Sequence, residues 1–322
     1  KISMNKKIFF ILVLFSSFCF SQENNILGKW ILEKITYSNG SDLEINHPLY
    51  STQMINYISP NSIIINGAKV DARFENNKII INNRVQEISF SNKFLTFNSL
   101  EDNLKYYFTK EKDFIEKYSE YLPNKTEKNN TEVLISNTII EPVFFDSYDF
   151  KQSFLISLIE KYEDSQNKNF DFFIKLIIDE NNKIISDEIF GENLIDKDIA
   201  NIKSVLKTKE NKFINTFGKK ILVNYNFKFG INSTYQKSKE NKFDKIFPQI
   251  KKYYNANQFN KVIDLYEKLD RKTYNESYNK QLLAISYLAT NKIDKACNTF
   301  LEIGKVTDFS VRNYVKNFCQ KN

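Results

Sequence analysis

Short apolar runs alternate with turn residues between residues 24 and 110. The runs are rich in Ile, Val, Phe and Tyr, and turn signals such as Ser38-Asn39-Gly40, Asn66-Gly67 and Asn82-Asn83 separate them. Asn-Gly is a strong hairpin signal, and Asn tolerates the positive φ that tight turns need. The pattern predicts about eight short strands in a meander, closed into a small antiparallel β-barrel over residues 24–110.

A mixed pattern follows over residues 134–230. Apolar residues recur at helical spacing in 150–162 and 195–206. Strand-like segments lie at 172–178, 183–190 and 221–229. This order predicts an α+β sandwich domain whose helices cover one face of a sheet.

The stretch between these two regions, residues 111–133, carries charges, Asn and a Pro without an apolar period. Such a composition is typical of a connection between domains. We therefore expect a linker at 111–133, with one helical turn around Phe114–Tyr121.

The last part of the chain, residues 240–322, repeats its apolar pattern after 34 residues. The core positions expected from this register are Tyr253, Phe259, Val262, Tyr266, Ala284, Tyr287, Ala296 and Phe300. Small and aromatic residues at these places resemble tetratricopeptide repeats, in which helical hairpins stack. The resemblance implies an all-α helical repeat of two units with turns at Asn257 and Asn291, capped by a final helix at 310–319.

The first 21 residues have the layout of a secretory signal peptide. Two lysines precede an apolar stretch that begins at Ile8, and Ser21 is a small residue suited to cleavage. An uncleaved anchor and a lipoprotein cut before Cys19 are the alternatives, but the apolar stretch is shorter than a bilayer span. We expect residues 1–21 to be removed by a cut after Ser21, which would leave a periplasmic or secreted chain without a stable membrane span.

Removal of that segment leaves two of the three cysteines, Cys297 and Cys319. In an oxidising compartment this pair is expected to form a disulfide, and two buried thiols are the alternative. The disulfide would tie the final helix to the second repeat.

Gly28 and Trp30 stand at the start of the first predicted strand, within Leu27-Gly28-Lys29-Trp30. This Gly-x-Trp resembles the opening of lipocalins and of the lipocalin-like domains of secreted Bacteroidota proteins. The resemblance implies that Trp30 plugs one end of the barrel and that the barrel is a cup for a small apolar ligand. A small barrel filled by its own Ile and Phe side chains is the alternative.

Between Phe172 and Phe229, the turn and helix positions follow a recognisable order. They are Asp179, Asn182-Lys183, Asp198, Ala200 and Gly218-Lys219. This order resembles the C-terminal domain of TonB-type energy transducers, although Asn182 replaces the usual Gly and Phe213 stands where that family often has Trp. The family implies a domain that adds a partner's peptide as a strand to an exposed sheet edge. A small stable fold reused as a module is the alternative.

The sequence contains no catalytic motif. The chain has one His, three Cys and seven Gly, and no nucleotide-binding, zinc-protease or nucleophile-elbow string occurs in it. The single His47 precedes Pro48 in an expected surface loop. We therefore assign no catalytic, cofactor-binding or metal-binding residue, and we expect a non-enzymatic protein without a cofactor.

The formal net charge of +7 is unevenly distributed along the chain. Residues 235–322 hold 17 Lys and Arg against 9 Asp and Glu, so this part carries +8. The excess would favour an acidic partner or an anionic membrane surface, and a solvated lysine-rich helix surface is the alternative. Nucleic acid is not expected, because the region has only two arginines, Arg271 and Arg312.

Together these features favour an exported, non-enzymatic adaptor that binds a protein or peptide partner in the cell envelope. The adaptor is favoured because two of the three modules resemble interaction domains and no catalytic motif accompanies them. Two alternatives stay open: a carrier of a small apolar ligand in the N-terminal barrel, and a component of a TonB-like energy-transduction system.

Overall fold

The computed structural model describes residues 26–75, 77–91, 93–128, 130–162, 169–230, 242–270, 277–305 and 307–320. The chain divides into two compact units. The first unit contains the chain up to Lys34 and from Met54 to Asn232, and the second, the helical unit, contains Ile35–Gln53 and Ser233–Asn322. The predicted signal peptide and its cleavage site lie outside the described residues. The protein is multidomain, as its sequence predicts.

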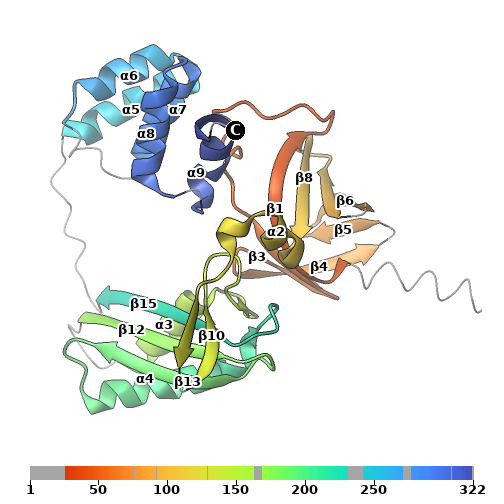
Figure 1. Ribbon diagram of the computed structural model, residues 1–322, viewed down its shortest axis with the longest axis vertical. Helices are drawn as coiled ribbons and strands as arrows, with labels where there is room; N and C mark the ends of the chain where they lie inside the picture. Colours follow the sequence, from red (N-terminus) through yellow and green to blue (C-terminus); the bar gives the residue numbers. More distant parts are fainter. Residues whose placement is uncertain are drawn as a thin grey trace, which may run out of the picture. The chain divides into compact units, whose positions relative to one another are not determined.

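Eight strands, each antiparallel to the next, close into a barrel at the start of the first unit (Figure 1). They are β1 (Gly28–Tyr37), β2 (Ile55–Ser59), β3 (Ser62–Ile65), β4 (Ala68–Glu75), β5 (Lys78–Ile81), β6 (Arg84–Ser91), β7 (Phe94–Ser99) and β8 (Leu104–Lys110). Several hairpins turn on asparagine, since Asn66, Asn77, Asn82 and Asn83 have positive φ. The short polar side chain of Asn tolerates this left-handed region, so it replaces the glycine that the chain rarely offers. The predicted barrel and its asparagine turns are confirmed.

The two residues of the predicted barrel signature lie at the beginning of β1. Gly28 has a φ of 110°, a conformation that other residues rarely adopt. Trp30 is fully buried, and its ring N–H donates a 2.7 Å hydrogen bond to the carbonyl of Ile26. Apolar side chains of β7 and β8 are also buried, with the rings of Phe97 and Phe108 5.0 Å apart.

Residues 111–133, expected as a linker, are instead folded into the first unit. They form α2 (Glu111–Lys117), η1 (Ser119–Tyr121), β9 (Lys125–Lys128) and the start of β10 (Thr131–Ile135). The helical turn expected around Phe114–Tyr121 is present, and its two aromatic ends are buried with ring centroids 5.4 Å apart. The polar composition misled the prediction because these elements are short and none of them buries more than three residues.

The rest of the first unit is an α+β domain. Its main sheet has the order β13-β12-β15-β10-β9, in which β12 spans Asn169–Ile178, β13 spans Ile184–Gly191 and β15 spans Ile221–Gly230. Its helices are α3 (Phe150–Glu160) and α4 (Asp196–Lys209), followed by η2 (Glu210–Lys212). The short strands β11 (Val143–Phe144) and β14 (Phe213–Ile214) pair separately.

One face of the main sheet is covered by both helices, as predicted. Alternate residues of β12 and β15, among them Ile174 and Tyr225, share a buried cluster with Phe154 of α3 and Ile202 of α4. A strand places every second side chain on the same face, so this alternation defines the side that the helices cover. The β9–β10 hairpin enlarges the sheet beyond the boundary expected at residue 134.

The helical unit contains α5 (Lys242–Asn255), α6 (Phe259–Glu267), α7 (Ser277–Ala289), α8 (Ile293–Ile303), α9 (Phe309–Tyr314) and η4 (Val315–Cys319). Helices α5 to α8 each contact the next, and Figure 1 shows them side by side. Helix α6 begins at Phe259 and helix α8 at Ile293. These starts are 34 residues apart, which equals the period of the apolar pattern in the sequence. Asn257 and Asn291 turn the chain before them with positive φ. The helices lie where the pattern predicts them. That they are tetratricopeptide repeats stays a prediction.

Candidate functional site

The eight predicted repeat positions all contribute to the core of the helical unit. Val262, Tyr266, Ala284, Tyr287, Ala296 and Phe300 belong to one buried cluster, and Tyr253 and Phe259 pack against it. The ring of Phe300 stacks on Tyr314 of α9 at 4.6 Å between centroids. Helix α9 therefore completes a core that α5 to α8 leave open at one end.

The segment formed by α9 and η4, residues 309–319, is a cap on this core. A disulfide joins Cys297 of α8 to Cys319 at the end of η4, with the two Cα atoms 5.5 Å apart. The predicted pairing is confirmed, and such a bond limits the freedom of the unfolded chain between its ends. Disulfides persist in oxidising compartments, so the bond fits a location outside the cytoplasm.

The β1–β2 loop, residues 38–53, is part of the helical unit and is held by the cap. The Tyr314 hydroxyl donates a 2.8 Å hydrogen bond to the main-chain carbonyl of Ile45. The Asn313 amide donates to the main-chain carbonyl of Tyr50 at 2.8 Å, and the Asn317 amide donates to the Tyr50 hydroxyl at 3.1 Å. Three side chains of the cap therefore bind the loop, two of them through its main chain.

Helix α7 and the turn before α6 bind the loop at two further points. The Gln281 amide donates to the hydroxyl of Ser51 at 3.0 Å, and the Asn46 amide donates to the side-chain oxygen of Asn257 at 2.7 Å. The loop thus contacts the helical unit at α7, at α9 and η4, and at the turn before α6.

Two apolar side chains anchor the loop. Ile45 and Tyr50 are partly buried against the helical core, and the Tyr50 ring lies 4.9 Å from that of Tyr314. Tyr314 is therefore in contact with Phe300 on one side and with the loop on the other. Aromatic pairs of this kind contribute beyond the area that they bury.

The loop is not a strand but a series of turns. The amides of His47, Tyr50 and Thr52 each donate to a carbonyl three residues earlier. His47 fixes one of these turns, because its Nδ1 accepts a 3.1 Å hydrogen bond from the amide of Leu49. The expectation that His47 lies in a loop is met, but the docking of this loop on the helices was not predicted.

A cavity of about 630 Å³ lies between the loop and helices α5 and α7. Glu44, Asn46 and His47 line it from the loop, and Lys251, Tyr254, Tyr278 and Gln281 line it from the helices. Its volume is within the usual range of ligand sites. We call this cavity, together with the helical surface under the loop, the groove.

Several hydrogen-bond donors line the groove. Burial, with a smaller effect of Tyr278, raises the pKa of Tyr254, and burial followed by Tyr254 raises the pKa of Tyr314, so both hydroxyls stay protonated. The carboxylate of Glu44 is already used, since it accepts a 2.6 Å hydrogen bond from the Tyr37 hydroxyl, which lowers the pKa of Glu44. Lys251 adds a positive charge to the lining. The groove therefore suits a ligand that supplies acceptors.

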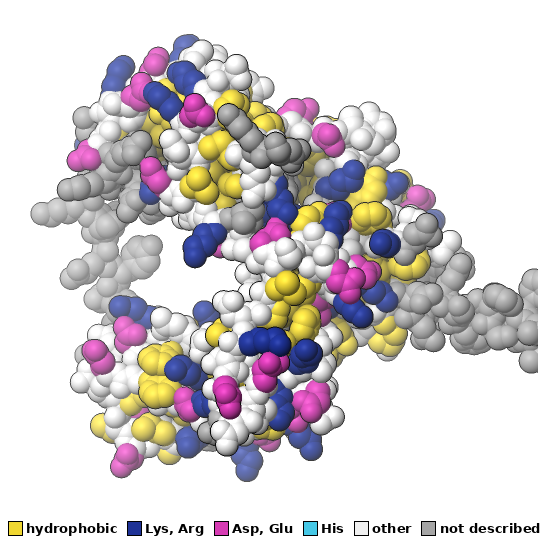
Figure 2. Space-filling view, viewed as in Figure 1, with side chains coloured by type: hydrophobic (Ala, Val, Ile, Leu, Met, Phe, Trp, Pro, Cys, Tyr) yellow, Lys and Arg dark blue, Asp and Glu magenta, His cyan; other side chains and the backbone are white. Residues whose placement is uncertain are grey.

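The surface of the helical unit is a mixture of basic and acidic side chains. Figure 2 shows lysines and arginines on its visible face, with acidic side chains between them. Exposed ion pairs such as Lys295–Glu267, at 3.3 Å, offset part of the positive charge. On this visible face the basic side chains are therefore interspersed with acidic ones.

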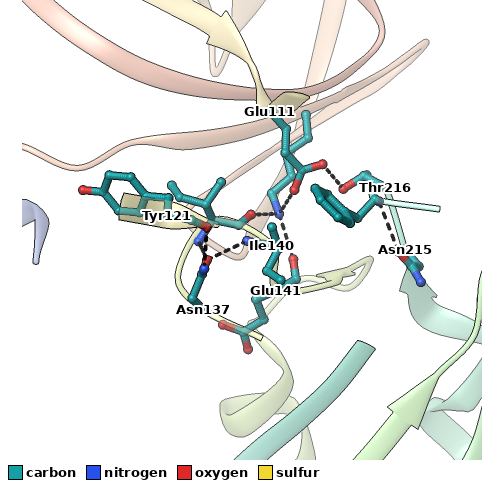
Figure 3. Close-up of polar contacts among 10 residues, drawn as sticks. Glu111, Tyr121, Asn137, Ile140, Glu141, Asn215 and Thr216 are labelled. Atoms are coloured by element: carbon teal, nitrogen blue, oxygen red, sulfur yellow. Dashed lines mark hydrogen bonds and ion pairs between the residues drawn. The ribbon is translucent and has the colours of Figure 1, made fainter. Parts of the chain in front are cut away.

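A second polar cluster lies inside the first unit, where the barrel meets the α+β domain (Figure 3). The Lys29 ammonium on β1 lies 2.9 Å from Glu111 Oε1 at the start of α2, and both side chains are more than nine-tenths buried. Lys29 also donates to the main-chain carbonyls of Ile139 and Glu141. Thr216 donates to the other carboxylate oxygen of Glu111 at 2.6 Å.

The side-chain amide of Asn137 fixes the loop that surrounds this ion pair. The Asn137 side chain donates to the carbonyl of Tyr121 at 2.8 Å and accepts hydrogen bonds from the amides of Ile139 and Ile140. These bonds hold the segment whose Ile139 carbonyl accepts from Lys29. The arrangement pairs a buried cation with a buried anion and main-chain dipoles, which is the usual requirement for burying charge.

Other chemistry is limited among the described residues. No group of three or more His, Cys, Asp and Glu side chains is placed to hold a metal ion in the described ranges. No helix within those ranges is long and apolar enough to cross a membrane. Neither a family model, nor a curated protein, nor a solved structure matches the chain.

Proposed function

We propose that the chain is a non-enzymatic, exported adaptor whose helical unit binds a peptide segment of a partner protein in the groove. The proposal rests mainly on one observation, the β1–β2 loop docked on α7 and the cap. Five side-chain hydrogen bonds and two apolar anchors hold a stretch of polypeptide on this surface. A surface that binds one irregular segment in this way has the chemistry needed to bind another.

The open part of the groove supports the same function. Lys251, Tyr278 and Gln281 line a volume that the loop leaves unfilled. Peptide grooves of helical domains combine apolar contacts with side chains that bind the peptide main chain. The proposed location is the periplasm or the outside of the cell, and the disulfide between Cys297 and Cys319 supports it.

The test is a selection of peptides from a random library on the purified full chain. A tryptophan at Asn255, an exposed residue that lines the cavity, would fill the groove, whereas a tryptophan at the exposed Asn260 of α6 is the matched control. We expect selected peptides to bind the wild type and Asn260→Trp and to lose at least tenfold in affinity for Asn255→Trp. Equal binding to all three proteins would contradict the proposal.

The α+β domain is a second candidate site for a peptide, through strand addition. Strand β10 pairs with β15 only at Ile221 and Leu222, and no other strand within the described ranges pairs with that side of β15. The carbonyl of Leu222 faces β10, since it accepts from the amide of Ser136. The two-residue period then turns the main-chain groups of Asn224 and Asn226 toward the same open side.

This edge is the feature that favours the TonB-like alternative over a module with no binding role. An extended peptide would add beside β15 through main-chain hydrogen bonds. A proline at Asn226 would remove an outward N–H, and Asn226→Ala would remove only the side chain. We expect peptide binding at this edge to be lost in Asn226→Pro and kept in Asn226→Ala. If both variants still bind the peptide, strand addition at this edge is contradicted. The carrier function of the barrel stays a prediction.

A further inference from the structure

We propose that the β1–β2 loop is an intramolecular ligand of the groove, and that the partner's segment is an acidic peptide with an aromatic anchor that takes its place. The inference rests on the proposed function and deepens it, because it names the class of peptide and the event that admits it. Four properties of the loop and the groove carry it.

The first property is that the cap recognises groups that every polypeptide has. Tyr314 and Asn313 donate to the main-chain carbonyls of Ile45 and Tyr50, at 2.8 Å in both cases. Such bonds do not depend on the side chains of the bound segment. A segment of another protein that follows the same path would therefore receive the same two bonds.

The second property is a place for one aromatic side chain. The Tyr50 ring packs on Tyr314, and its hydroxyl accepts from Asn317 at 3.1 Å. A bound aromatic ring gains contact area and a favourable ring-to-ring geometry. The competing segment should therefore carry an aromatic residue, with tyrosine preferred, where the loop carries Tyr50.

The third property is charge. Residues 38–53 contain two acidic residues, Asp42 and Glu44, and no Lys or Arg, whereas residues 235–322 carry a net +8. Lys251 lines the open part of the groove from the helices, whereas the Glu44 carboxylate belongs to the loop and would leave with it. An acidic segment is favoured on such a surface, and a basic one is disfavoured.

The fourth property is that the loop can leave without opening the barrel. The four residue pairs between β1 and β2 run from Gly28↔Ile58 to Ile31↔Ile55, all outside the loop. The loop itself has few buried side chains and makes mostly exposed or partly buried hydrogen bonds. Segments of this kind open locally at much lower free energy than the core.

A labelled peptide of residues 41–53 tests the inference on the full chain by fluorescence anisotropy. In the wild type the attached loop competes at the high effective concentration of a tethered segment. We expect Tyr50→Ala in the protein to weaken the attached loop and to increase peptide affinity at least tenfold. Adding Asn313→Ala to this variant should reverse the gain, because it removes a donor of the groove.

Two altered peptides test the chemistry of the ligand. A peptide with Tyr50→Ala should bind the Tyr50→Ala protein at least tenfold more weakly, and one with Asp42→Lys and Glu44→Lys at least fivefold more weakly. Thermal unfolding and an intact disulfide would show that each protein variant is folded.

Equal affinity of the unaltered peptide for the wild type and the Tyr50→Ala protein would show that the attached loop does not compete with the peptide for the groove. Tighter binding of the lysine-substituted peptide would overturn the inference that the partner's segment is acidic. If the folded Tyr50→Ala protein does not bind the loop peptide but still binds library-selected peptides at the groove, this inference fails while the proposed function stands.

Discussion

The Tyr314 hydroxyl donates a 2.8 Å hydrogen bond to the main-chain carbonyl of Ile45, 269 residues earlier in the chain. This contact brings the loop of a barrel hairpin into the helical unit. It also shows how the cap, which the Cys297–Cys319 disulfide ties to α8, becomes part of the surface that holds the loop. The loop, the cap and the cavity beside them form one site.

Tyr314→Phe should loosen the loop while keeping the core. The phenylalanine ring can still pack on Phe300 and Tyr50, but the bond to Ile45 is lost, which costs about 1 kcal/mol. Amide hydrogen exchange over residues 43–52 should become about fivefold faster. Tyr278→Phe is the matched control, because Tyr278 lines the cavity but makes no hydrogen bond to a loop carbonyl within the described part of the chain. Unchanged exchange in Tyr314→Phe would show that the hydrogen bond to Ile45 does not stabilise the docked loop.

Replacing both Cys297 and Cys319 by serine should destabilise the helical unit by about 2–4 kcal/mol, because the bridge no longer restricts the unfolded chain. Since the cap holds the loop, exchange over residues 43–52 should accelerate together with that of η4. Reducing agent should have the same effect on the wild type and none on the double variant. A loop that keeps its protection when the bridge is absent would show that the cap is held by packing alone.

Lys29→Met should destabilise the first unit by about 3–5 kcal/mol, because Glu111 would remain buried without its cation. Adding Glu111→Gln should recover a large part of this loss, since the buried charge is then removed. The exposed pair Lys228–Asp171, at 3.2 Å, is the control, and Lys228→Met should cost no more than about 1 kcal/mol. Denaturant unfolding monitored by Trp30 fluorescence measures all three. Similar losses at the two pairs would contradict the role assigned to burial.

The depressed pKa of Asp146 should make the stability of the α+β domain depend on pH. Burial alone would raise the pKa of Asp146, but hydrogen bonds from Lys212, the Ser147 amide and Ser153 lower it from 3.8 to about 2. A carboxyl whose folded pKa is depressed stabilises the fold above its unfolded pKa and loses that effect as the pH falls from about 4 to about 2. The contribution at neutral pH is about 2 kcal/mol. Asp146→Asn should remove this part of the slope, and an unchanged slope between pH 4 and pH 2 would contradict the assignment.

The sequence predicted those features that depend on local patterns. Asn66 and Asn82 turn barrel hairpins because asparagine accepts positive φ, and the alternation around Tyr225 marks the buried face of β15. The pairing of Cys297 with Cys319 followed from their number and from the oxidising compartment that the sequence predicts. Each of these features can be inferred from neighbouring residues without knowing the tertiary contacts.

Features formed by distant residues were not predicted. Strand β9 reads as a linker because it is a polar edge strand, and only its pairing with β10 reveals it. The apolar Ile45 and Tyr50 were the signal that the β1–β2 loop is covered, but the pattern does not say by what. Lys29 and Glu111 are 82 positions apart, and no local pattern distinguishes a buried pair from two surface charges.

Photo-crosslinking from inside the groove tests whether the helical unit binds a partner's peptide there. A photoreactive amino acid at Asn255 lines the groove, whereas one at Asp264, on the exposed side of α6, does not. In intact cells we expect a crosslinked partner protein from Asn255, much less product from Asp264, and attachment through an acidic segment with an aromatic residue. Equal crosslinking from the two positions, or none from Asn255 in a folded and exported protein, would contradict peptide binding in the groove.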